Sequence, residues 1–398
     1  MTLPRVILKP RRARPFYNRH PWVFSGAIGR VEGEPQAGCQ ADLFSQEGEF
    51  IGRGLYNPDS NIRLRLYSWE PEEQLDERFW SERIDQATEL RRQLFPTWSD
   101  HTAFRLVYSE ADGLSGLTVD RYGDWLIVQL TSLALASQQE LLVQLLNDKL
   151  RPAGIWLRTE KGIAELEGLS LTDGPLAGAA PPRPLFIEEH GIRFGVDIVE
   201  GQKTGFYLDQ RENRAAAAGY CRNRRVLDAF CYSGGFGISA LKLGGAKQVL
   251  ALDVSEAALA LARENSALND LRGSIEFKKA DAFSALQELH DAGERFDAVV
   301  LDPPKMTRHR AGLKQALRAY HNLNEMAVHL LNPGGMLVTC NCSGLISTDD
   351  FILTLAGVAT ATGRRIRILE SRGAAPDHPA GVQCLETSYL QCIICHVE

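Results

Sequence analysis

Two apolar, strand-like segments in the C-terminal half end in residues that could carry out nucleophilic catalysis. One ends in Asp302-Pro-Pro-Lys305 and the other in Thr339-Cys-Asn-Cys-Ser-Gly344. A cysteine thiolate can add to carbon 6 of a pyrimidine, and carbon 5 then becomes a nucleophile that can attack a methyl donor. A partly exposed cysteine at a strand end suits this chemistry. Cys342, Cys340 and Asp302 are therefore the candidate catalytic residues.

The two cysteines differ in their expected surroundings. Cys340 still lies within the apolar segment, where cysteine commonly packs as a small hydrophobic residue, whereas Cys342 precedes Ser-Gly in the following loop. This favours Cys342 as the nucleophile. However, the alternation of side chains along a strand would put both cysteines on one face. The sequence therefore leaves the choice between them open.

A glycine-rich turn after an earlier strand-like segment indicates a cofactor site. Asp228 ends that segment, and Phe230-Cys-Tyr-Ser-Gly-Gly-Phe-Gly237 follows. The turn lacks the Gly-x-Gly-x-x-Gly spacing of dinucleotide sites, and Asp228 would repel a pyrophosphate. An acid at this position suits a ligand with an ammonium and a sulfonium group. We therefore predict S-adenosylmethionine (SAM) as the cofactor.

Two further acids follow the next two strand-like segments. Asp253 could accept hydrogen bonds from both ribose hydroxyls, with Ser255 as the N-cap of the following helix. Asp281 is expected near the adenine. Three acids at successive strand ends disfavour the alternative that they only cap loops. The cofactor residues predicted around these segments are Asp228, Phe230, Tyr232, Ser233, Gly234, Gly235, Asp253, Val254, Ser255, Asp281, Ala282 and Asp302.

The elements that carry these residues alternate between strand and helix. The strand-like segments are 226–230, 249–253, 274–279, 296–302 and 336–340, and the helix-like segments are 237–243, 256–268 and 314–331. Fully apolar strands that alternate with helices are typical of a parallel sheet covered on both faces. The second half of the chain is therefore predicted to be an α/β, Rossmann-like domain.

The first half reads as two smaller domains. Short strand-like runs between residues 8 and 66 indicate a small β-rich module. After it, a helix is predicted at 79–95, strands at 117–119 and 125–130 around a turn at 120–123, and another helix at 133–150. This pattern predicts a central α+β domain. The predicted division is 1–72, 73–185 and 186–398.

Composition favours a cytoplasmic protein that does not span a membrane. The chain of 398 residues is 44% hydrophobic, and no run of 18 apolar residues occurs in it. The basic N-terminus lacks the apolar core of a signal peptide, and eight cysteines in a chain of this length suit a reducing compartment. Cys392-Ile-Ile-Cys395 lies in a strand-like run without a second half-site, so no metal site is predicted.

The charge distribution indicates a nucleic-acid partner despite a net charge of −6. Residues 1–31 hold seven Lys or Arg and no acid, and residues 303–324 hold five more, again without an acid. Local basic stretches attract phosphate even on an acidic protein, although they could also be solvated surfaces. The residues predicted to contact RNA are Arg11, Arg12, Arg14, Lys305, Arg308 and Arg310.

Long motifs in a fixed order resemble the bacterial ribosomal RNA large-subunit methyltransferase I family over nearly the whole chain. The motifs are His20-Pro-Trp-Val-Phe-Ser-Gly26, 111–122, Lys203-Thr-Gly-Phe-Tyr-Leu-Asp-Gln-Arg-Glu-Asn213, Phe230–Gly235, Asp302–Lys305 and Cys342-Ser-Gly344. The resemblance implies an N-terminal PUA domain, a central α+β domain and a Rossmann-like catalytic domain. It also implies 5-methylcytosine formation in 23S ribosomal RNA, with Cys342 at the position of the family's conserved cysteine.

The resemblance adds the segment 202–213, which would cover the cofactor. Phe206, Asp209 and Gln210 join the predicted cofactor residues on that ground. Lys305 stands where methyltransferases of exocyclic amines usually carry an aromatic residue, so amine methylation is disfavoured. Methylation of another RNA base, or an inactive RNA-binding assembly factor, are the alternatives. The residues do not identify the general base or the modified nucleotide, and they do not distinguish cytosine from uracil. They also leave the oligomeric state open, and a homodimer is one possibility.

Overall fold

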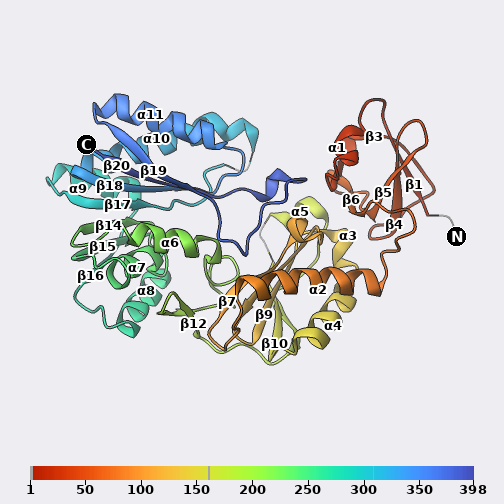
Figure 1. Ribbon diagram of the computed structural model, residues 1–398, viewed down its shortest axis with the longest axis horizontal. Coiled ribbons are helices and arrows are strands. Elements are labelled where there is room, and N and C mark those ends of the chain that lie inside the picture. The colour runs from red at the N-terminus through yellow and green to blue at the C-terminus, as the bar shows by residue number, and fades with distance from the viewer. Residues whose placement is uncertain (1–2, 160–161, 308) are drawn as a thin grey trace. The chain divides into compact units, whose positions relative to one another are not determined.

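The structure is a computed structural model that describes residues 3–159, 162–307 and 309–398 (Figure 1). These residues form two compact units. The first unit contains Met1–Ile187, Asp197–Phe206 and Pro376–Thr387. The second contains Glu188–Val196, Tyr207–Ala375 and Ser388–Glu398. The domain limits at 72 and 185 remain a prediction, and the two short segments that belong to the first unit were not foreseen.

The first unit begins with a six-stranded sheet. Its strands are β1 (Arg5–Leu8), β2 (Trp22–Phe24), β3 (Ile28–Glu32), β4 (Gln40–Phe44), β5 (Phe50–Tyr56) and β6 (Ile62–Ser68), in the order β2-β6-β5-β4-β1-β3. The short helix α1 (Arg14–Tyr17) follows β1. Alternate residues such as Val6, Leu43 and Leu64 are fully buried and form one core. The β-rich module is therefore present as predicted.

A five-stranded sheet with helices completes the first unit. The strands are β7 (Ala103–Tyr108), β8 (Leu117–Tyr122), β9 (Trp125–Leu130), β10 (Gly154–Leu157) and β11 (Gly174–Gly178), in the order β11-β10-β9-β8-β7. The helices are α2 (Glu77–Leu94), α3 (Leu133–Ala136), α4 (Gln139–Leu150) and α5 (Ile163–Glu167). The Asp76 carboxylate accepts the Phe79 N–H at 3.0 Å, which caps α2 where the apolar pattern begins.

The predicted turn at 120–123 is wrong. Strand β8 continues through Asp120 to Tyr122, and the chain turns at Gly123, whose φ is +57°. The fully buried Asp120 carboxylate accepts two hydrogen bonds of 2.8 Å from the Arg105 guanidinium on the neighbouring β7. This pairing lets an acid occupy a strand position, which its weak strand preference argued against.

The single helix predicted at 133–150 is also wrong, because the structure divides it into α3 and α4. The break lies at Ser137 and Gln138. The Ser137 hydroxyl donates to the carbonyl of Ala134 at 2.7 Å. Such local bonds compete with the helical backbone pattern and explain why the apolar spacing alone missed the break.

The second unit is built on a seven-stranded sheet. The strands are β14 (Arg225–Ala229), β15 (Gln248–Asp253), β16 (Ile275–Lys279), β17 (Phe296–Leu301), β18 (Leu331–Asn341), β19 (Ile366–Arg372) and β20 (Gln391–Val397). Their order is β16-β15-β14-β17-β18-β20-β19. The first five are parallel, whereas β20 is antiparallel to both of its neighbours. Strands β12 (Leu185–Glu189) and β13 (Ile192–Val196) precede this sheet.

Helices cover both faces of the seven-stranded sheet (Figure 1). They are α6 (Arg211–Ala218), α7 (Gly235–Lys242), α8 (Glu256–Leu268), α9 (Ala282–Asp291), α10 (Leu313–Leu330) and α11 (Thr348–Thr362). One core lies on the face of α9, α10 and α11, and the other on the face of α6, α7 and α8. The predicted Rossmann-like fold is confirmed, although β19, α6, α9 and α11 were not predicted. Among the described residues, no helix has the length and apolarity needed to cross a membrane.

Candidate cofactor and catalytic site

The passage from β14 into α7 is shaped by two glycines, one at the N-cap of α7 and one in its first turn. Gly234 has φ +87°, a conformation that side chains other than glycine rarely adopt. At Gly237, an added Cβ would lie 3.2 Å from the Asp228 carboxylate and 3.0 Å from Val249. The absence of a side chain lets the Gly237 N–H donate to Asp228 at 2.8 Å. The backbone after β14 is therefore held close to Asp228, the second-last residue of the first parallel strand.

Asp228 has the electrostatics expected of an acid that awaits a cationic ligand. It is 1% exposed, and burial raises the pKa of its carboxyl to about 7, with the nearby Asp302 and Asp253 adding to the effect. One oxygen accepts from Gly237, and among the described residues the other has no hydrogen-bond partner. A buried carboxylate oxygen without a donor fits the ammonium group of SAM.

The residues that follow β14 are held by the acid at the end of β15. The Asp253 carboxylate accepts the Tyr232 N–H at 2.9 Å and the Ser255 N–H at 2.8 Å. Tyr232 has φ +46° and Phe230 φ +147°, both rare for non-glycine residues. Strained backbone of this kind is concentrated at ligand sites. Asp253 therefore fixes the turn and places an acceptor beside it.

Asn265, on α8, holds the same loop and was not found from the sequence. Its amide donates to the carbonyls of Ser233 at 3.1 Å and Gly195 at 3.3 Å, and its oxygen accepts the Gly195 N–H at 2.7 Å. The side chain thus ties the glycine loop to β13. Its only signal in the sequence is a polar residue on the apolar face of a helix.

Asp281 has the surroundings of a helix cap. It is exposed, and its carboxylate accepts the N–H and the hydroxyl of Ser284 at 3.0 Å and 3.2 Å at the start of α9. The neighbouring Ala282 is buried, whereas Val254 is 60% exposed. Ser255 caps α8 by accepting the Ala258 N–H at 3.2 Å, as predicted. The assignment of Asp281 to the adenine stays a prediction.

The two strand-end acids Asp253 and Asp281 allow a matched test. Asp253→Ala is expected to weaken SAM binding by about 1–3 kcal/mol, because a charged acceptor and the support of the Tyr232 turn are both lost. Asp281→Ala is expected to cost about 1 kcal/mol of stability through the lost cap, with a smaller effect on binding. Calorimetric titration of SAM into the folded variants measures both, and unchanged affinity in Asp253→Ala would contradict the ribose assignment.

The acid after β17 is held by an oriented side-chain amide. The Gln210 amide donates to the Asp302 carboxylate at 2.9 Å, and the Gln210 oxygen accepts from Asn213 at 2.7 Å. Asn213 in turn donates to the Gly373 carbonyl at 3.0 Å and accepts from Arg372 at 3.1 Å. These contacts fix which end of the Gln210 amide faces Asp302. Gln210 was predicted to touch the cofactor, and the structure places it on the candidate catalytic acid.

The structure separates the two cysteines that follow the fifth parallel strand. Cys340 is 1% exposed and packs in the core on the α6 face, opposite Cys392 in the register of β18 and β20. The Cys392 thiol, and then burial, hold the pKa of Cys340 well above its usual value. Cys342 lies beyond the end of β18, is half-buried, and has its sulfur 3.8 Å from the carbonyl oxygen of Pro303.

Two tyrosines beside these residues were not found from the sequence. The Tyr207 ring packs edge-on against Tyr232 with centroids 5.4 Å apart. Burial and then the nearby Asp302 raise the pKa of Tyr207, so the phenol stays neutral. The Tyr389 hydroxyl donates to the Asp209 carboxylate, which is itself buried. Tyrosines carry no spacing signal in a single sequence, which is why both were missed.

The remaining predicted residues are divided between the two units. Phe206 belongs to the first unit, where it is buried and its N–H donates to the Tyr122 hydroxyl at 3.1 Å. Ser233 and Gly235 are buried within the glycine loop. Arg308 lies outside the described residues. The exposed residues of the predicted RNA surface are Arg11, Arg12 and Arg14 in the first unit and Lys305 and Arg310 in the second.

Comparisons with known proteins agree with this architecture. Residues 6–69 match the family model of PUA-like domains, and residues 176–385 match that of S-adenosylmethionine-dependent methyltransferases. A protein of Streptococcus mutans assigned as a SAM-dependent methyltransferase has the same fold, with a TM-score of 0.85 at 18% identity over 98% of this chain and 99% of that chain. The predicted PUA-like domain and the SAM cofactor are therefore confirmed.

Curated relatives extend over the full chain. The chain is 43% identical to the ribosomal RNA large subunit methyltransferase I of Tolumonas auensis, over 98% of both proteins. It is 41% identical to the enzyme of that name from Escherichia coli, over 99% of both. The chain is therefore a SAM-dependent methyltransferase and belongs to the ribosomal RNA large subunit methyltransferase I family.

Proposed function

We propose that the chain methylates carbon 5 of a cytosine in 23S ribosomal RNA through a covalent adduct between Cys342 and carbon 6. The observation that carries the proposal is the position of Cys342, half-buried past the end of β18 and 3.8 Å from the Pro303 carbonyl in the turn that Asp302 begins. A thiol at this place can reach a base that the carboxylate holds. The relatives' name supports ribosomal RNA as the substrate.

In the proposed reaction, the Cys342 thiolate forms a bond to carbon 6 of the ring. The electron pair of the carbon 5–carbon 6 double bond is displaced, and carbon 5 becomes an enamine-type nucleophile. SAM, when bound, supplies an electrophilic methyl group, which carbon 5 takes. A base then removes the carbon-5 proton, the double bond reforms, and the carbon–sulfur bond breaks to return the thiolate.

The hydrogen bond to Asp302 supports cytosine over uracil. Gln210 donates to one oxygen of this carboxylate, so an ionised Asp302 presents acceptors toward the base. Cytosine carries an amino donor on carbon 4, whereas uracil carries an acceptor there. A carboxylate therefore pairs with cytosine and repels uracil at this edge. The cytosine assignment also agrees with the family resemblance.

The basic arm of the first unit, which carries Arg11, Arg12 and Arg14, is proposed to contact RNA phosphates. Ribosomal RNA as the partner implies a cytoplasmic location. Replacing Arg11, Arg12 and Arg14 with Ala together is expected to weaken RNA binding and to lower the slope of log affinity against log salt by roughly 2–3. SAM affinity is expected to stay unchanged, since these residues lie outside the second unit. Binding titrations at several salt concentrations measure the slope. An unchanged slope would show that the basic arm does not contact the RNA.

The proposed function is tested by mass mapping of ribosomal RNA from cells with and without the gene. One cytosine in 23S RNA is expected to lose a single methyl group when the gene is deleted, and the purified protein with SAM is expected to restore it in vitro. The assay should use RNA that is unpaired at the target, because chemistry on a base requires it outside the stack. A change in another base would contradict the cytosine proposal, and no change would support a role in assembly alone.

A further inference from the structure

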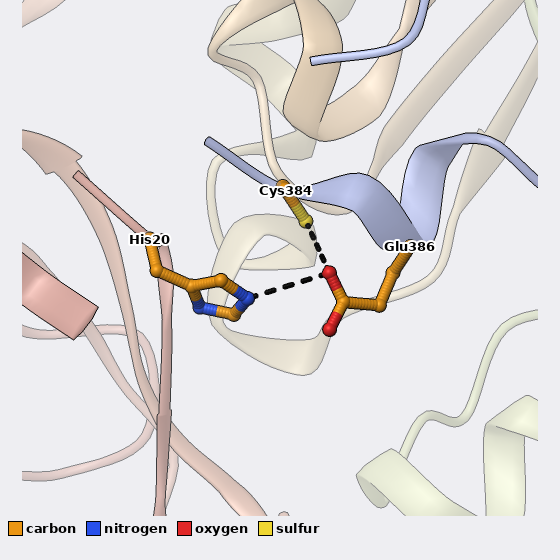
Figure 2. Close-up of side chains that lie close together, drawn as sticks. All are labelled: His20, Cys384 and Glu386. Carbon is orange, nitrogen blue, oxygen red and sulfur yellow. Dashed lines mark hydrogen bonds and ion pairs between the residues drawn. The ribbon is translucent and has the colours of Figure 1, made fainter. Parts of the chain in front are cut away.

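Three side chains with metal-binding atoms meet within the first unit, and none of them belongs to the second unit (Figure 2). His20 precedes β2, whereas Cys384 and Glu386 belong to the segment Pro376–Thr387. The His20 Nε2 lies 3.4 Å from the Glu386 Oε2, and the Cys384 Sγ lies 3.5 Å from that same oxygen. All three donor atoms lie within 4.8 Å of one another. None of the three is among the predicted cofactor-binding, catalytic or RNA-binding residues.

The separations fit the coordination sphere of a small tetrahedral ion. Zinc binds nitrogen and oxygen at about 2.0–2.2 Å and sulfur at about 2.3 Å, so neighbouring ligand atoms are roughly 3.3–3.8 Å apart. The distances from the Glu386 Oε2 to the His20 Nε2 and to the Cys384 Sγ, 3.4 Å and 3.5 Å, fall in this range. The third side of the triangle joins the His20 Nε2 to the Cys384 Sγ and is at most 4.8 Å long. Closing it requires a small rotation of the His20 side chain, which is 20% exposed. The ligand set of imidazole, thiolate and carboxylate is one that zinc accepts.

We propose that His20, Cys384 and Glu386 bind one zinc ion, with a fourth position taken by water. Cys384 is 2% exposed and provides a fixed anchor, whereas Glu386 faces solvent and provides the route of entry. The nearby carboxylate of Glu110, which accepts the Trp22 indole N–H at 2.9 Å, adds negative charge that favours a cation. The site is independent of the proposed methyl transfer.

One hydrogen bond opposes the ion and must be exchanged. The His20 Nδ1 accepts the backbone N–H of Trp22 at 3.2 Å, so the neutral ring carries its proton on Nε2 and donates to Glu386. Zinc on Nε2 requires the proton to move to Nδ1, and the contact with Trp22 is then lost. A single backbone hydrogen bond contributes little beside the free energy of zinc coordination, so the exchange favours the bound form.

Zinc would join two segments that are far apart along the chain. His20 and Glu386 are separated by 366 positions, and the ion would fasten the segment Pro376–Thr387 to the β-rich module. A cross-link between distant positions removes freedom from the unfolded chain. Zinc is therefore expected to raise the melting temperature of the full-length protein, with the first unit most affected.

The test uses the full-length chain freed of metal with a chelator and then titrated with Co²⁺, which takes tetrahedral zinc sites and reports thiolate ligation by its charge-transfer absorption. One equivalent of Co²⁺ is expected to give that absorption, and Zn²⁺ is expected to displace it. Cys384→Ser is expected to abolish the absorption, and His20→Gln to weaken Co²⁺ binding at least tenfold. Cys39→Ser removes another half-buried thiol of the first unit and is the matched control, expected to behave as the wild type.

The variants remain interpretable because SAM binding reports the folding of the second unit, which contains none of the three ligands. If Cys384→Ser did not fold, His20→Gln would still test the metal site, because His20 is partly exposed and its replacement should not prevent folding. The absence of a stoichiometric cobalt absorption, or an absorption of equal intensity in Cys384→Ser, would overturn the proposal. Loss of the absorption in Cys39→Ser would assign the metal to a different thiol and would overturn it as well.

Discussion

Cys342→Ala is expected to lose methyl transfer completely while keeping SAM affinity within twofold of the wild type. Without addition to carbon 6, carbon 5 of cytosine has no route to nucleophilic character, so the loss should exceed about 10⁴-fold. The thiol lies beyond the end of β18 and is only half-buried, so its removal should change stability little. Single-turnover methylation of RNA and calorimetric titration of SAM give the two numbers.

Cys340→Ala is the matched control, two residues away. Its thiol is buried beside Cys392, so truncation leaves a small cavity and should cost about 1 kcal/mol of stability. Methyl transfer by the folded fraction is expected to stay within a few-fold of the wild type. The reverse pattern, with an active Cys342→Ala and an inactive but stable Cys340→Ala, would exchange the two assignments.

Asp302→Asn is expected to lower kcat by roughly 10²–10⁴-fold, with a smaller change in KM. The asparagine keeps the shape of the side chain, and its oxygen can still accept from the Gln210 amide. The negative charge that would hold the cytosine amino group is lost, and the amide presents a donor instead. Steady-state kinetics at saturating SAM measure the two constants.

Gln210→Ala separates the charge of Asp302 from its orientation. The carboxylate remains, but it loses the donor at 2.9 Å that positions it, so a loss of about tenfold in kcat is expected. If Asp302→Asn were as active as the wild type, Asp302 would not hold the base. If Gln210→Ala were as impaired as Asp302→Asn, Gln210 would act on the substrate directly rather than through the acid.

The sequence predicts the elements whose pattern is local. The apolar segments 226–230 and 249–253 are strands, and the helix predicted at 256–268 has the limits observed for α8. Continuous apolar runs predict the two strands, and a serine N-cap predicts the start of the helix, because these signals do not depend on the rest of the fold. The positions of Asp228 and Asp253 could be predicted in the same way, because each lies near the end of a strand and Asp228 precedes a glycine-rich turn.

Features set by tertiary contacts could not be predicted. Asp120 lies in a strand only because Arg105 pairs with it, and Gln210 reaches Asp302 from a position 92 residues away. The grouping of His20 with Cys384 depends on a C-terminal segment that folds with the first unit. Contacts at such separations leave no periodicity in a single sequence.

The two cysteines show a limit of periodicity itself. Alternation predicts one face for Cys340 and Cys342 as long as the strand continues. The strand ends at Asn341, and the N–H of Ser343, two residues later, donates to the Asn341 side chain at 2.8 Å. This turn redirects the chain after the strand, so the rule no longer applies to Cys342. The end of the strand, rather than its pattern, distinguishes the two thiols.

The most direct test of the account is the site of covalent attachment to RNA that carries 5-fluorocytosine at the target. Fluorine replaces the proton that a base must remove, so the reaction should stop after methyl transfer with the enzyme still bonded to carbon 6. Peptide mapping is expected to find the RNA attached to the peptide that contains Cys342, and only in the presence of SAM. Attachment at Cys340, or no adduct from an enzyme that methylates ordinary RNA, would contradict the account.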